Sequence, residues 1–448
     1  MREDRMGFSA GLFAERRARV RKALAGGILI LPPAPVLRRP GGTEYVYRPS
    51  SELFYLTGSV DPGTVAVLRD CDEEGFVLFV PRPDPEVELW SGPRMGPAEA
   101  KEVLGPDAVF PLEELEDRLP PMLRAHRRVY FRLGEDERLE ALVLQGLRWA
   151  RARGARMGRG PRSVEDPGEI LDPLRLVKDP EELQRIRRAA GITVSAFQEA
   201  MTSTRPGMGE WELEALLEAR FRREGGLGPA FPTIAGSGGN GCVLHYVDNA
   251  HRLEAGELVL LDGGAEVDLY AGDVTRTFPV AGRFSDAQRD VYEVVLRGRD
   301  AALSAVGPGS TIEAVHRAAV LEMLEGLIGL GLVKGDPLQL LEEKAHEVFF
   351  PHRTSHWLGL DVHDVGDYVV GSRGRPLEPG MVFTVEPGLY FPRGDFESEH
   401  PYGGLGVRIE DDILVTEAGF ENLTGSLPTH PAEVEALVGS GPGEESSG

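Results

Sequence analysis

The sequence predicts a protein of the α/β (α+β) class with two domains. Its 448 residues exceed what one domain usually holds, and 41% of them are hydrophobic, which is ample for buried cores. Short apolar runs of strand length alternate with amphipathic helical patterns as far as residue 150. A capped helical pattern then opens a second half, in which strand-like runs lead into acidic residues.

The first half is predicted to alternate strands with helices. Residues 28–31 are Ile-Leu-Ile-Leu and predict a buried strand, and residues 64–68 and 76–80 predict two more. Apolar residues recur at helical spacing over 8–20 and 136–150, which predicts a helix in each. Strands mixed with helices indicate an α/β layer.

The second half follows a stretch, 151–179, whose Arg, Gly, Pro and Asp content indicates a linker. Asp179 suits a helix N-cap, and Glu182, three residues later, completes a capping box. Apolar residues then recur on one face of the predicted helix. Two more long helices are predicted, at 285–306 and 311–329.

These patterns place a domain boundary between residues 172 and 173. We expect an amino-terminal domain at 1–172, a larger domain at 173–436 and a tail at 437–448. Gly, Ser and Glu dominate the tail, which holds too little apolar surface to pack, so we expect it to be flexible.

The charge balance argues against nucleic acid and anionic membranes as partners. The chain has 49 Lys+Arg against 72 Asp+Glu, a formal net charge of −23, whereas both partners require a basic surface. Two cysteines are too few for a disulfide framework, and no apolar run approaches the length of a membrane span. The first residues are charged and lack the apolar stretch of a secretory signal. We therefore expect a cytoplasmic protein.

The densest chemical signal is a histidine cluster. Three of the ten histidines, His352, His356 and His363, lie within twelve positions. They do not form the metal-binding helix H-E-x-x-H, because Arg353 stands where that motif needs Glu. In one continuous strand His356 and His363 would point to opposite faces, so we expect Gly359 to supply a bend that brings both to one site.

Two carboxylates accompany an apolar strand pattern that begins at Leu258. Asp262 ends the pattern, and Asp273 lies eleven positions later, so a hairpin of that length brings both to one point. Taken singly, Asp262 is an ordinary turn residue, and Asp273 could instead pair with Arg276.

Two further carboxylates follow strand-like runs near the carboxyl end. Glu386 ends the run from Met381, and as an isolated residue it would be a solvent-facing strand end. Arg408 and Glu410 alternate onto one face of the next run, where a cross-paired surface strand is the ordinary alternative.

The four carboxylates and the histidine cluster together predict a metal site. Converging carboxylates repel each other and lose solvation unless cations neutralise them, and one divalent ion balances only two of the charges. Four carboxylates with one imidazole therefore suit two divalent ions. This oxygen-rich set favours Mn²⁺ over a zinc site rich in Cys or His, while Co²⁺, Fe²⁺ and Zn²⁺ stay open.

These segments resemble those of the Xaa-Pro aminopeptidase (aminopeptidase P) family, pita-bread metallopeptidases that also include prolidase, methionine aminopeptidase and creatinase. Residues 352–364 fit the proline-peptidase signature of that family throughout. The resemblance covers nearly the whole chain. It implies a creatinase-like α/β amino-terminal domain followed by a pita-bread catalytic domain.

The resemblance implies five metal ligands, which are Asp262, Asp273, His356, Glu386 and Glu410. Asp273 and Glu410 would bridge two divalent ions. Asp262 would hold one ion, and His356 and Glu386 the other. All five residue types are intact in this chain.

Catalytic roles follow from the same resemblance. Glu386 would act as general base toward the attacking water, and His363 or His245 would stabilise the oxyanion. His352 would line the substrate site with them, although an isolated histidine such as His245 is more often structural. Arg408 would lie behind the metal ligands.

The resemblance implies an aminopeptidase that hydrolyses the bond between an N-terminal residue and a following proline in peptides. The alternatives are a prolidase, which cuts only Xaa-Pro dipeptides, and a metal-independent creatinase-like hydrolase or binding module. Trp90 resembles a tryptophan that reaches a neighbouring subunit's site in oligomeric members. We therefore expect a homo-oligomer, a dimer or a tetramer.

Overall fold

A computed structural model describes residues 7–71, 73–392 and 400–441 of the chain. The chain divides into two compact units, residues 1–174 and 175–448. Most of the tail expected at 437–448 lies outside the described residues. Within its described part, the backbone N–H groups of Gly439 and Gly441 donate to Met201 and Thr202 carbonyls.

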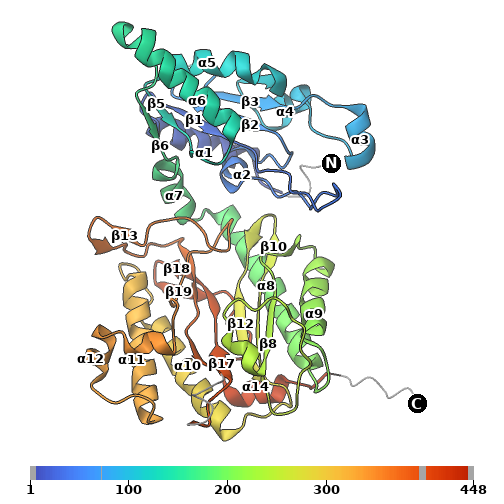
Figure 1. Cartoon of the computed structure of the whole chain (residues 1–448), viewed down its shortest axis with the longest axis vertical. Coiled ribbons are helices and arrows are strands. Elements are labelled where there is room, and N and C mark those ends of the chain that lie inside the picture. Colours follow the sequence, from blue (N-terminus) through green and yellow to red (C-terminus); the bar gives the residue numbers. More distant parts are fainter. Residues whose placement is uncertain (1–6, 72, 393–399, 442–448) are drawn as a thin grey trace. The chain divides into compact units, whose positions relative to one another are not determined.

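The first unit is built on a mixed six-stranded sheet in the order β4-β3-β2-β1-β5-β6 (Figure 1). Its strands are β1 (Ile28–Leu31), β2 (Val65–Arg69), β3 (Phe76–Val80), β4 (Ala108–Pro111), β5 (Arg128–Tyr130) and β6 (Ser163–Glu165). The central pairs β1–β2 and β2–β3 are antiparallel, and the outer pairs are parallel. The predictions at 28–31, 64–68 and 76–80 are confirmed.

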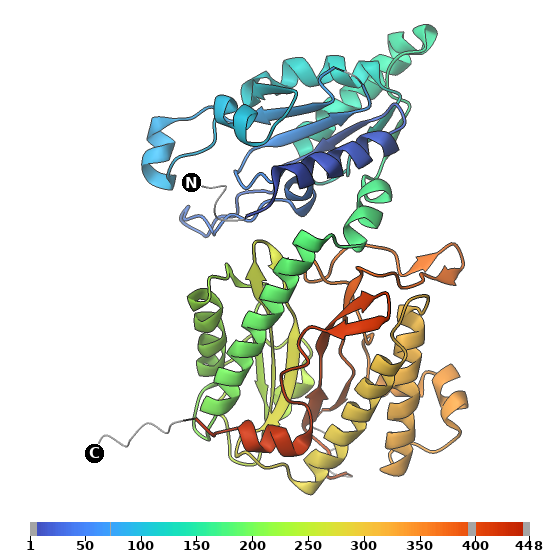
Figure 2. The same cartoon turned by 180° about the vertical axis from the view of Figure 1, so that it is seen from behind.

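Helices cover both faces of this sheet (Figures 1 and 2). They are α1 (Ala10–Ala23), α2 (Ser51–Thr57), α3 (Pro85–Ser91), α4 (Pro97–Val103), α5 (Leu115–Ala125) and α6 (Glu137–Trp149). Alternate strand residues such as Ile28, Val67 and Phe79 pack with side chains of α5 and α6. The intervening residues are also buried, which explains why these strands are continuous apolar runs.

The prediction of a linker at 151–179 is wrong for much of that stretch. Strand β6 pairs in parallel with β5, and α7 (Gly168–Leu176) follows it. A three-residue edge strand is too short to show a periodicity, and only its partner strand fixes its conformation.

The second unit contains two pairs of long helices. Its helices are α8 (Pro180–Ser203), α9 (Glu210–Arg223), α10 (Asp286–Ser304), α11 (Ile312–Gly329), α12 (Pro337–Glu342) and α14 (Pro431–Leu437). The predicted capping box of Asp179 and Glu182 is present, and Ser285 and Thr311 cap α10 and α11. Figure 2 shows α8 and α10 lying across one face of the strands.

Small antiparallel sheets form the centre of this unit. Two of them have the orders β12-β9-β8 and β15-β18-β19, and a third is the pair β16-β17. Their strands are β8 (Ile234–Ser237), β9 (Leu258–Gly263), β12 (Val274–Pro279), β15 (Val382–Val385), β16 (Gly388–Phe391), β17 (Leu405–Arg408), β18 (Asp411–Thr416) and β19 (Gly419–Asn422). The remaining short strands are β7 (Gly228–Pro229), β10 (Ala265–Val267), β11 (Tyr270–Ala271), β13 (Val369–Val370) and β14 (Arg373–Gly374). A single large apolar core joins these sheets to the helices.

Two further expectations concern the whole chain. Across the described ranges, no helix combines the length and the apolar character that crossing a bilayer requires. Cys71 and Cys242 are both free thiols, in agreement with the expectation that no disulfide framework is present.

Candidate active site

The first two carboxylates lie at the open end of the β9–β12 hairpin. Thr275 stands opposite Asp262 in the register of the hairpin, so Asp273 lies next to that pair. The loop closes tightly between Gly264 and Gly272, because a β-carbon on Gly264 would lie 1.6 Å from the Gly272 carbonyl oxygen. The hairpin expected from the eleven-residue spacing is present.

The alternative pairing of Asp273 with Arg276 does not occur. The Arg276 guanidinium is fully buried and binds Asp411 Oδ1 at 2.8 Å. It also donates to the backbone carbonyl of Glu410 at 2.5 Å, and so fixes the chain next to that carboxylate.

The other two carboxylates lie where neighbouring strands leave their sheet. Glu386 follows β15, and Glu410 separates β17 from β18. Strand β15 pairs with β18, and β16 pairs with β17, so the two acids lie at the same crossing. The Thr275 hydroxyl donates to Glu410 Oε2 at 2.7 Å and ties this crossing to the β9–β12 hairpin.

The histidine segment runs beside β15. The backbone N–H of His356 donates to Thr384 Oγ1 at 3.1 Å, and Thr384 N–H donates to the His356 carbonyl at 2.9 Å. The chain then turns at Gly359, where a β-carbon would lie 2.2 Å from Asp364 Oδ2. As a result the rings of His356 and His363 meet edge to face with centroids 4.4 Å apart, as the bend at Gly359 led us to expect.

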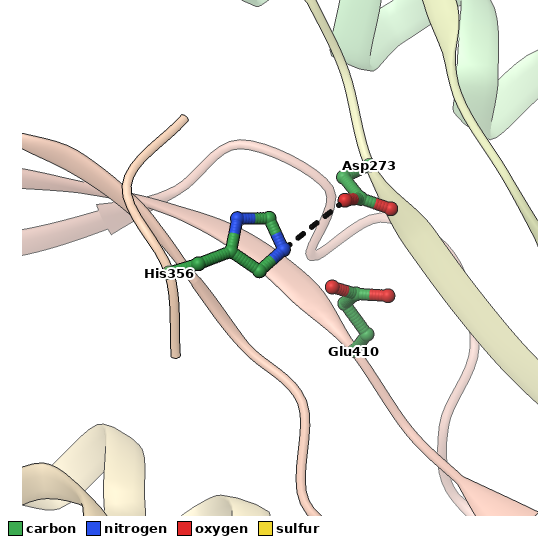
Figure 3. Close-up of side chains that lie close together, drawn as sticks. All are labelled: Asp273, His356 and Glu410. Carbon is green, nitrogen blue, oxygen red and sulfur yellow. Dashed lines mark ion pairs between the residues drawn. The ribbon is translucent and has the colours of Figure 1, made fainter. Parts of the chain in front are cut away.

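Figure 3 shows three of the five expected ligands pointing toward one another from three separate segments. One ligand atom each of Asp273, His356 and Glu410 lies within 4.8 Å of the others. His356 Nε2 is 3.4 Å from Asp273 Oδ2 and 3.5 Å from Glu386 Oε1. His356 Nδ1 lies 3.1 Å from the Trp357 carbonyl, which orients Nε2 toward the carboxylates.

Arg408 organises the remaining side of the cluster. Its Nη2 donates to Asp262 Oδ2 at 2.5 Å, and its Nε donates to Thr275 Oγ1 at 2.9 Å. Since Thr275 in turn donates to Glu410, one guanidinium orients two carboxylates. Thr275 was not among the predicted site residues, although it alternates with Asp273 onto the same face of the strand.

A second chain of hydrogen bonds leads from Arg408 to His352. Arg408 Nη1 donates to the Tyr390 hydroxyl at 2.9 Å, and that oxygen lies 2.8 Å from His352 Nε2. His352 Nδ1 is 2.8 Å from the Arg353 carbonyl, which can only accept. Burial and the nearby Arg408 charge lower the pKa of His352 to about 3, so the ring is neutral and accepts from Tyr390. Tyr390 was also missed, although it shares the strand face of Glu386.

Asp412 is a third buried group that the sequence analysis passed over. Its Oδ2 accepts from the backbone N–H of Asp273 at 3.1 Å and so holds that residue in place. Burial and the charge of Asp273 raise the pKa of Asp412 well above its usual range. Its position one residue into β18 gave no signal, because Asp411 and Asp412 resemble an ordinary acidic turn in sequence.

Burial, and to a smaller extent mutual repulsion, shifts the pKa values of the carboxylates. Burial raises the pKa of Asp262 to about 6, despite Arg408, and raises the pKa of Glu386 to about 7. Burial and the charges of Asp273 and Glu386 raise the pKa of Glu410 well above its usual range. Burial lowers the pKa of His356, but Asp273 and Glu386 outweigh it and raise that pKa to about 9.

This donor set fits divalent ions. Among the residues that the structure describes, Asp262 Oδ1 is a buried oxygen without a hydrogen-bond partner. Three buried carboxylates and the half-buried Glu386 have Arg408 and His356 as their neighbouring cations in the described part of the chain, which leaves negative charge to be neutralised. Carboxylate oxygens with one imidazole suit harder divalent ions.

A cavity of about 670 Å³ opens over the cluster. Its polar lining includes all five expected ligands together with His245, His352, His363 and Arg408. Its apolar lining is formed by Phe231, Pro232, Ile234, Leu244, Val247 and Val362. The structure therefore brings every site residue predicted in the second half of the chain to one cavity.

Ion binding is expected to release protons. Without ions, Glu386, Glu410 and His356 hold protons near pH 7, and an ion binds only their deprotonated forms. Addition of Mn²⁺ to the chelated protein should therefore acidify a weakly buffered solution, as measured with a pH indicator. The variant Glu410→Gln should release fewer protons, and an equal release from it would contradict the assignment.

The same shifts give a pH dependence of stability. The folded pKa values of Asp262 and Glu386 lie above the unfolded ones of about 4, so protonation stabilises the ion-free fold at low pH. That stability is lost as pH rises through about 6 to 7. Above this range divalent ions, rather than protons, neutralise the carboxylates. The rise in Tm on adding Mn²⁺ should consequently be larger at pH 8 than at pH 6.

Comparison with known proteins gives two family matches. The model of metallopeptidase family M24 matches residues 184–417, and that of the aminopeptidase P N-terminal domain matches residues 13–130. The Xaa-Pro aminopeptidase of Escherichia coli is 42% identical over 425 residues, which cover 94% of this chain and 96% of that protein.

Solved structures agree over the whole fold. A zinc-substituted Escherichia coli aminopeptidase P in complex with product superposes with a TM-score of 0.90 at 42% identity, covering 96% of this chain and 98% of that one. The same enzyme with the inhibitor Pro-Leu gives a TM-score of 0.89 at the same identity and coverage. The predicted fold class, a pita-bread domain preceded by a smaller α/β domain, is confirmed.

Proposed function

This chain belongs to metallopeptidase family M24, and on that premise we propose which of its residues hold metal ions and carry out hydrolysis. The chain is a metallo-exopeptidase that hydrolyses the bond between an N-terminal residue and a following proline. The prolidase and metal-independent alternatives are not favoured, since the Escherichia coli relative at 42% identity is an Xaa-Pro aminopeptidase. The observation that carries the proposal below is the convergence of four carboxylates and His356 beneath one cavity.

Two divalent ions are proposed to bind this cluster. Asp262, Asp273, His356, Glu386 and Glu410 would hold them. The raised pKa values of Asp262 and Glu410 support this proposal, because bound cations would offset both the burial and the mutual repulsion that raise them. Mn²⁺ is the ion that we propose, since oxygen donors outnumber nitrogen four to one.

Glu386 is proposed as the general base. When bound, the ions supply Lewis-acid chemistry, which lowers the pKa of water and polarises a carbonyl. The Glu386 carboxylate lines the cavity beside His356, so it can take a proton from the attacking water and return it to the leaving proline nitrogen. Thr384 Oγ1, 3.4 Å from Glu386 Oε1, helps to fix the carboxylate.

The histidines are proposed to bind the scissile carbonyl and the substrate. His363 and His245 line the cavity and are exposed to it, so either can donate to the oxygen on which negative charge develops. Burial lowers the pKa of His363, which keeps the ring neutral near pH 7. His352 is held by Tyr390 and Arg408, and is proposed to position the substrate rather than to transfer a proton.

A peptide with proline at its second position is the proposed substrate. Its free amine would lie near the carboxylates, and its pyrrolidine ring suits the apolar wall that includes Phe231, Ile234 and Val362. The cavity is large enough for more than a dipeptide, which supports a peptide substrate.

Hydrolysis of peptides that differ only in length tests this function. We expect cleavage of Gly-Pro-Gly-Gly with Mn²⁺, with kcat/KM at least tenfold above that for Gly-Pro, a difference of about 1.4 kcal/mol in transition-state binding. Gly-Ala-Gly-Gly serves as the control for proline specificity. A preference for Gly-Pro over the tetrapeptide would make the protein a prolidase, and cleavage of neither would remove the proposal.

We further propose a cytoplasmic homo-oligomer. Two free cysteines suit a reducing compartment. Trp90, on α3, exposes 87% of its surface, which suits contact with another subunit. The proposed domain boundary stays between residues 172 and 173.

A further inference from the structure

The turn that carries His363 is anchored at both of its ends. Residues 361–364 form this turn, in which Val362 and His363 line the substrate cavity. The two flanking residues are both acids, Asp361 and Asp364, and they point to one arginine. The residues that face the cavity are thus bracketed by two charged anchors.

Arg175 supplies both anchor contacts through a single nitrogen. Its Nη2 donates to Asp361 Oδ2 at 2.7 Å and to Asp364 Oδ1 at 2.5 Å. Arg175 lies in the last turn of α7, 186 residues before Asp361 in the chain, so this contact is purely tertiary. One guanidinium therefore sets the separation between the two ends of the turn.

The inner end of the turn is the more deeply buried. Arg175, Lys178 and Asp364 expose 3%, 1% and 1% of their side chains, and Lys178 Nζ binds Asp364 Oδ2 at 3.0 Å. The backbone N–H of Asp364 donates to the Trp357 carbonyl at 2.9 Å, directly after His356. Gly359 also packs against the Asp364 carboxylate. The bend between His356 and Asp364 is therefore in direct contact with the ion cluster of Arg175, Lys178 and Asp364.

The position of His363 depends on this anchoring. Its ring touches the His356 ring, with centroids 4.4 Å apart, and no hydrogen bond of its own side chain is evident among the described contacts. Among the described contacts, the ion pairs of Asp361 and Asp364 with Arg175 are thus the main restraint on the position of the ring. A displacement of about 1 Å at such a group is enough to reduce catalysis by about 10²-fold.

We propose that Arg175 is a positioning residue of the active site, which holds His363 over the metal ligands by binding Asp361 and Asp364 at the two ends of its turn. This inference rests on the proposed function of the cavity. A merely structural ion cluster would stabilise the domain without affecting His363, and the two possibilities differ in measurable ways.

Asp361→Ala is the variant that separates them. Asp361 exposes 38% of its side chain, so its loss releases the outer anchor while the buried pair of Arg175 with Asp364 stays intact. We expect kcat/KM to fall by about tenfold with little change in Tm. Glu421→Ala is the matched control, because Glu421 is 43% exposed and binds Arg187 at 2.6 Å on the surface of the same unit. It should retain the activity of the parent protein.

A double-mutant cycle tests whether the effect passes through His363. In the His363→Ala background, Asp361→Ala should cause no further loss, because the group that it positions is already absent. Losses that multiply in the double variant would overturn the proposal. Arg175→Met should give a larger loss, about 10²-fold, but it also leaves the buried Asp364 without one of its partners and lowers Tm, so Asp361→Ala decides the question.

Hydrogen–deuterium exchange supplies a readout that does not depend on activity. Backbone amides of residues 359–366 should exchange faster in Asp361→Ala than in the parent or in Glu421→Ala. Unchanged exchange together with unchanged kcat/KM would refute the positioning role. Absence of any Xaa-Pro hydrolysis by the parent protein would instead refute the proposed function, while the exchange result would still report on the anchor.

Discussion

Glu386→Ala should abolish nearly all hydrolysis of Xaa-Pro peptides, with kcat reduced by about 10²–10⁴-fold. The change removes the proposed general base and one proposed ligand together. It also leaves His356 without one of the two carboxylates within 3.5 Å of its Nε2. Steady-state kinetics on Gly-Pro-Gly-Gly, with metal content measured on the same samples, would show the loss of activity and of bound ion.

The matched control for this variant is Glu435→Ala. Glu386 and Glu435 each expose 16% of their side chains. Glu435 lies outside the cavity lining and binds Arg289 at a distance of 2.6 Å. Glu435→Ala should therefore keep its metal and its activity. The conservative variant Glu386→Gln separates the two roles of Glu386, since it retains an oxygen donor but cannot accept the proton. Full hydrolysis by Glu386→Ala would contradict the assignment of the site.

Removal of divalent ions should reduce hydrolysis to the background rate, and return of Mn²⁺ should restore it. The reason is the number of carboxylates in the cluster, because four acids share one buried Arg408 and one His356. Burial also raises the pKa of Asp262 to about 6 and that of Glu386 to about 7, so additional cations favour the ionised forms. The measurement is hydrolysis after exhaustive dialysis against a chelator, followed by titration with each ion.

Comparison of ions gives this prediction its specificity. Mn²⁺ should restore activity with a stoichiometry near two ions per chain. The order in which Co²⁺, Fe²⁺ and Zn²⁺ restore hydrolysis identifies whether oxygen or nitrogen ligands dominate the site. Mg²⁺ is a suitable control, since it binds oxygen donors but accepts imidazole poorly. Undiminished hydrolysis by protein shown to be metal-free would favour the metal-independent relatives instead.

The comparison of sequence with structure separates local signals from tertiary ones. Helix α8 was predictable, because Asp179 and Glu182 specify its start within four residues. Strand β6 was not, because its three residues adopt their conformation only by pairing with β5. The buried groups Thr275, Tyr390 and Asp412 escaped for a similar reason. Each is an ordinary strand residue until the folded chain places it against Arg408 or Asp273.

The sequence by itself determined which residue types could form the site. The residue types, their positions at strand ends and the signature between His352 and Asp364 were sufficient to predict four carboxylates, one imidazole ligand and flanking histidines. These features can be read from neighbouring residues, since an acid at the end of an apolar run indicates where a buried strand ends next to a cavity.

Only the tertiary structure decided how these groups are held. Arg408 orients Asp262 from 146 positions away, and Arg175 reaches Asp364 over 189. Arg408 was expected near the ligands, but its pairing with Asp262 was not, and nothing in the local pattern distinguishes Arg175 from the other basic residues of the chain. Both pairings depend on burial of the arginine beside a carboxylate that is distant in sequence.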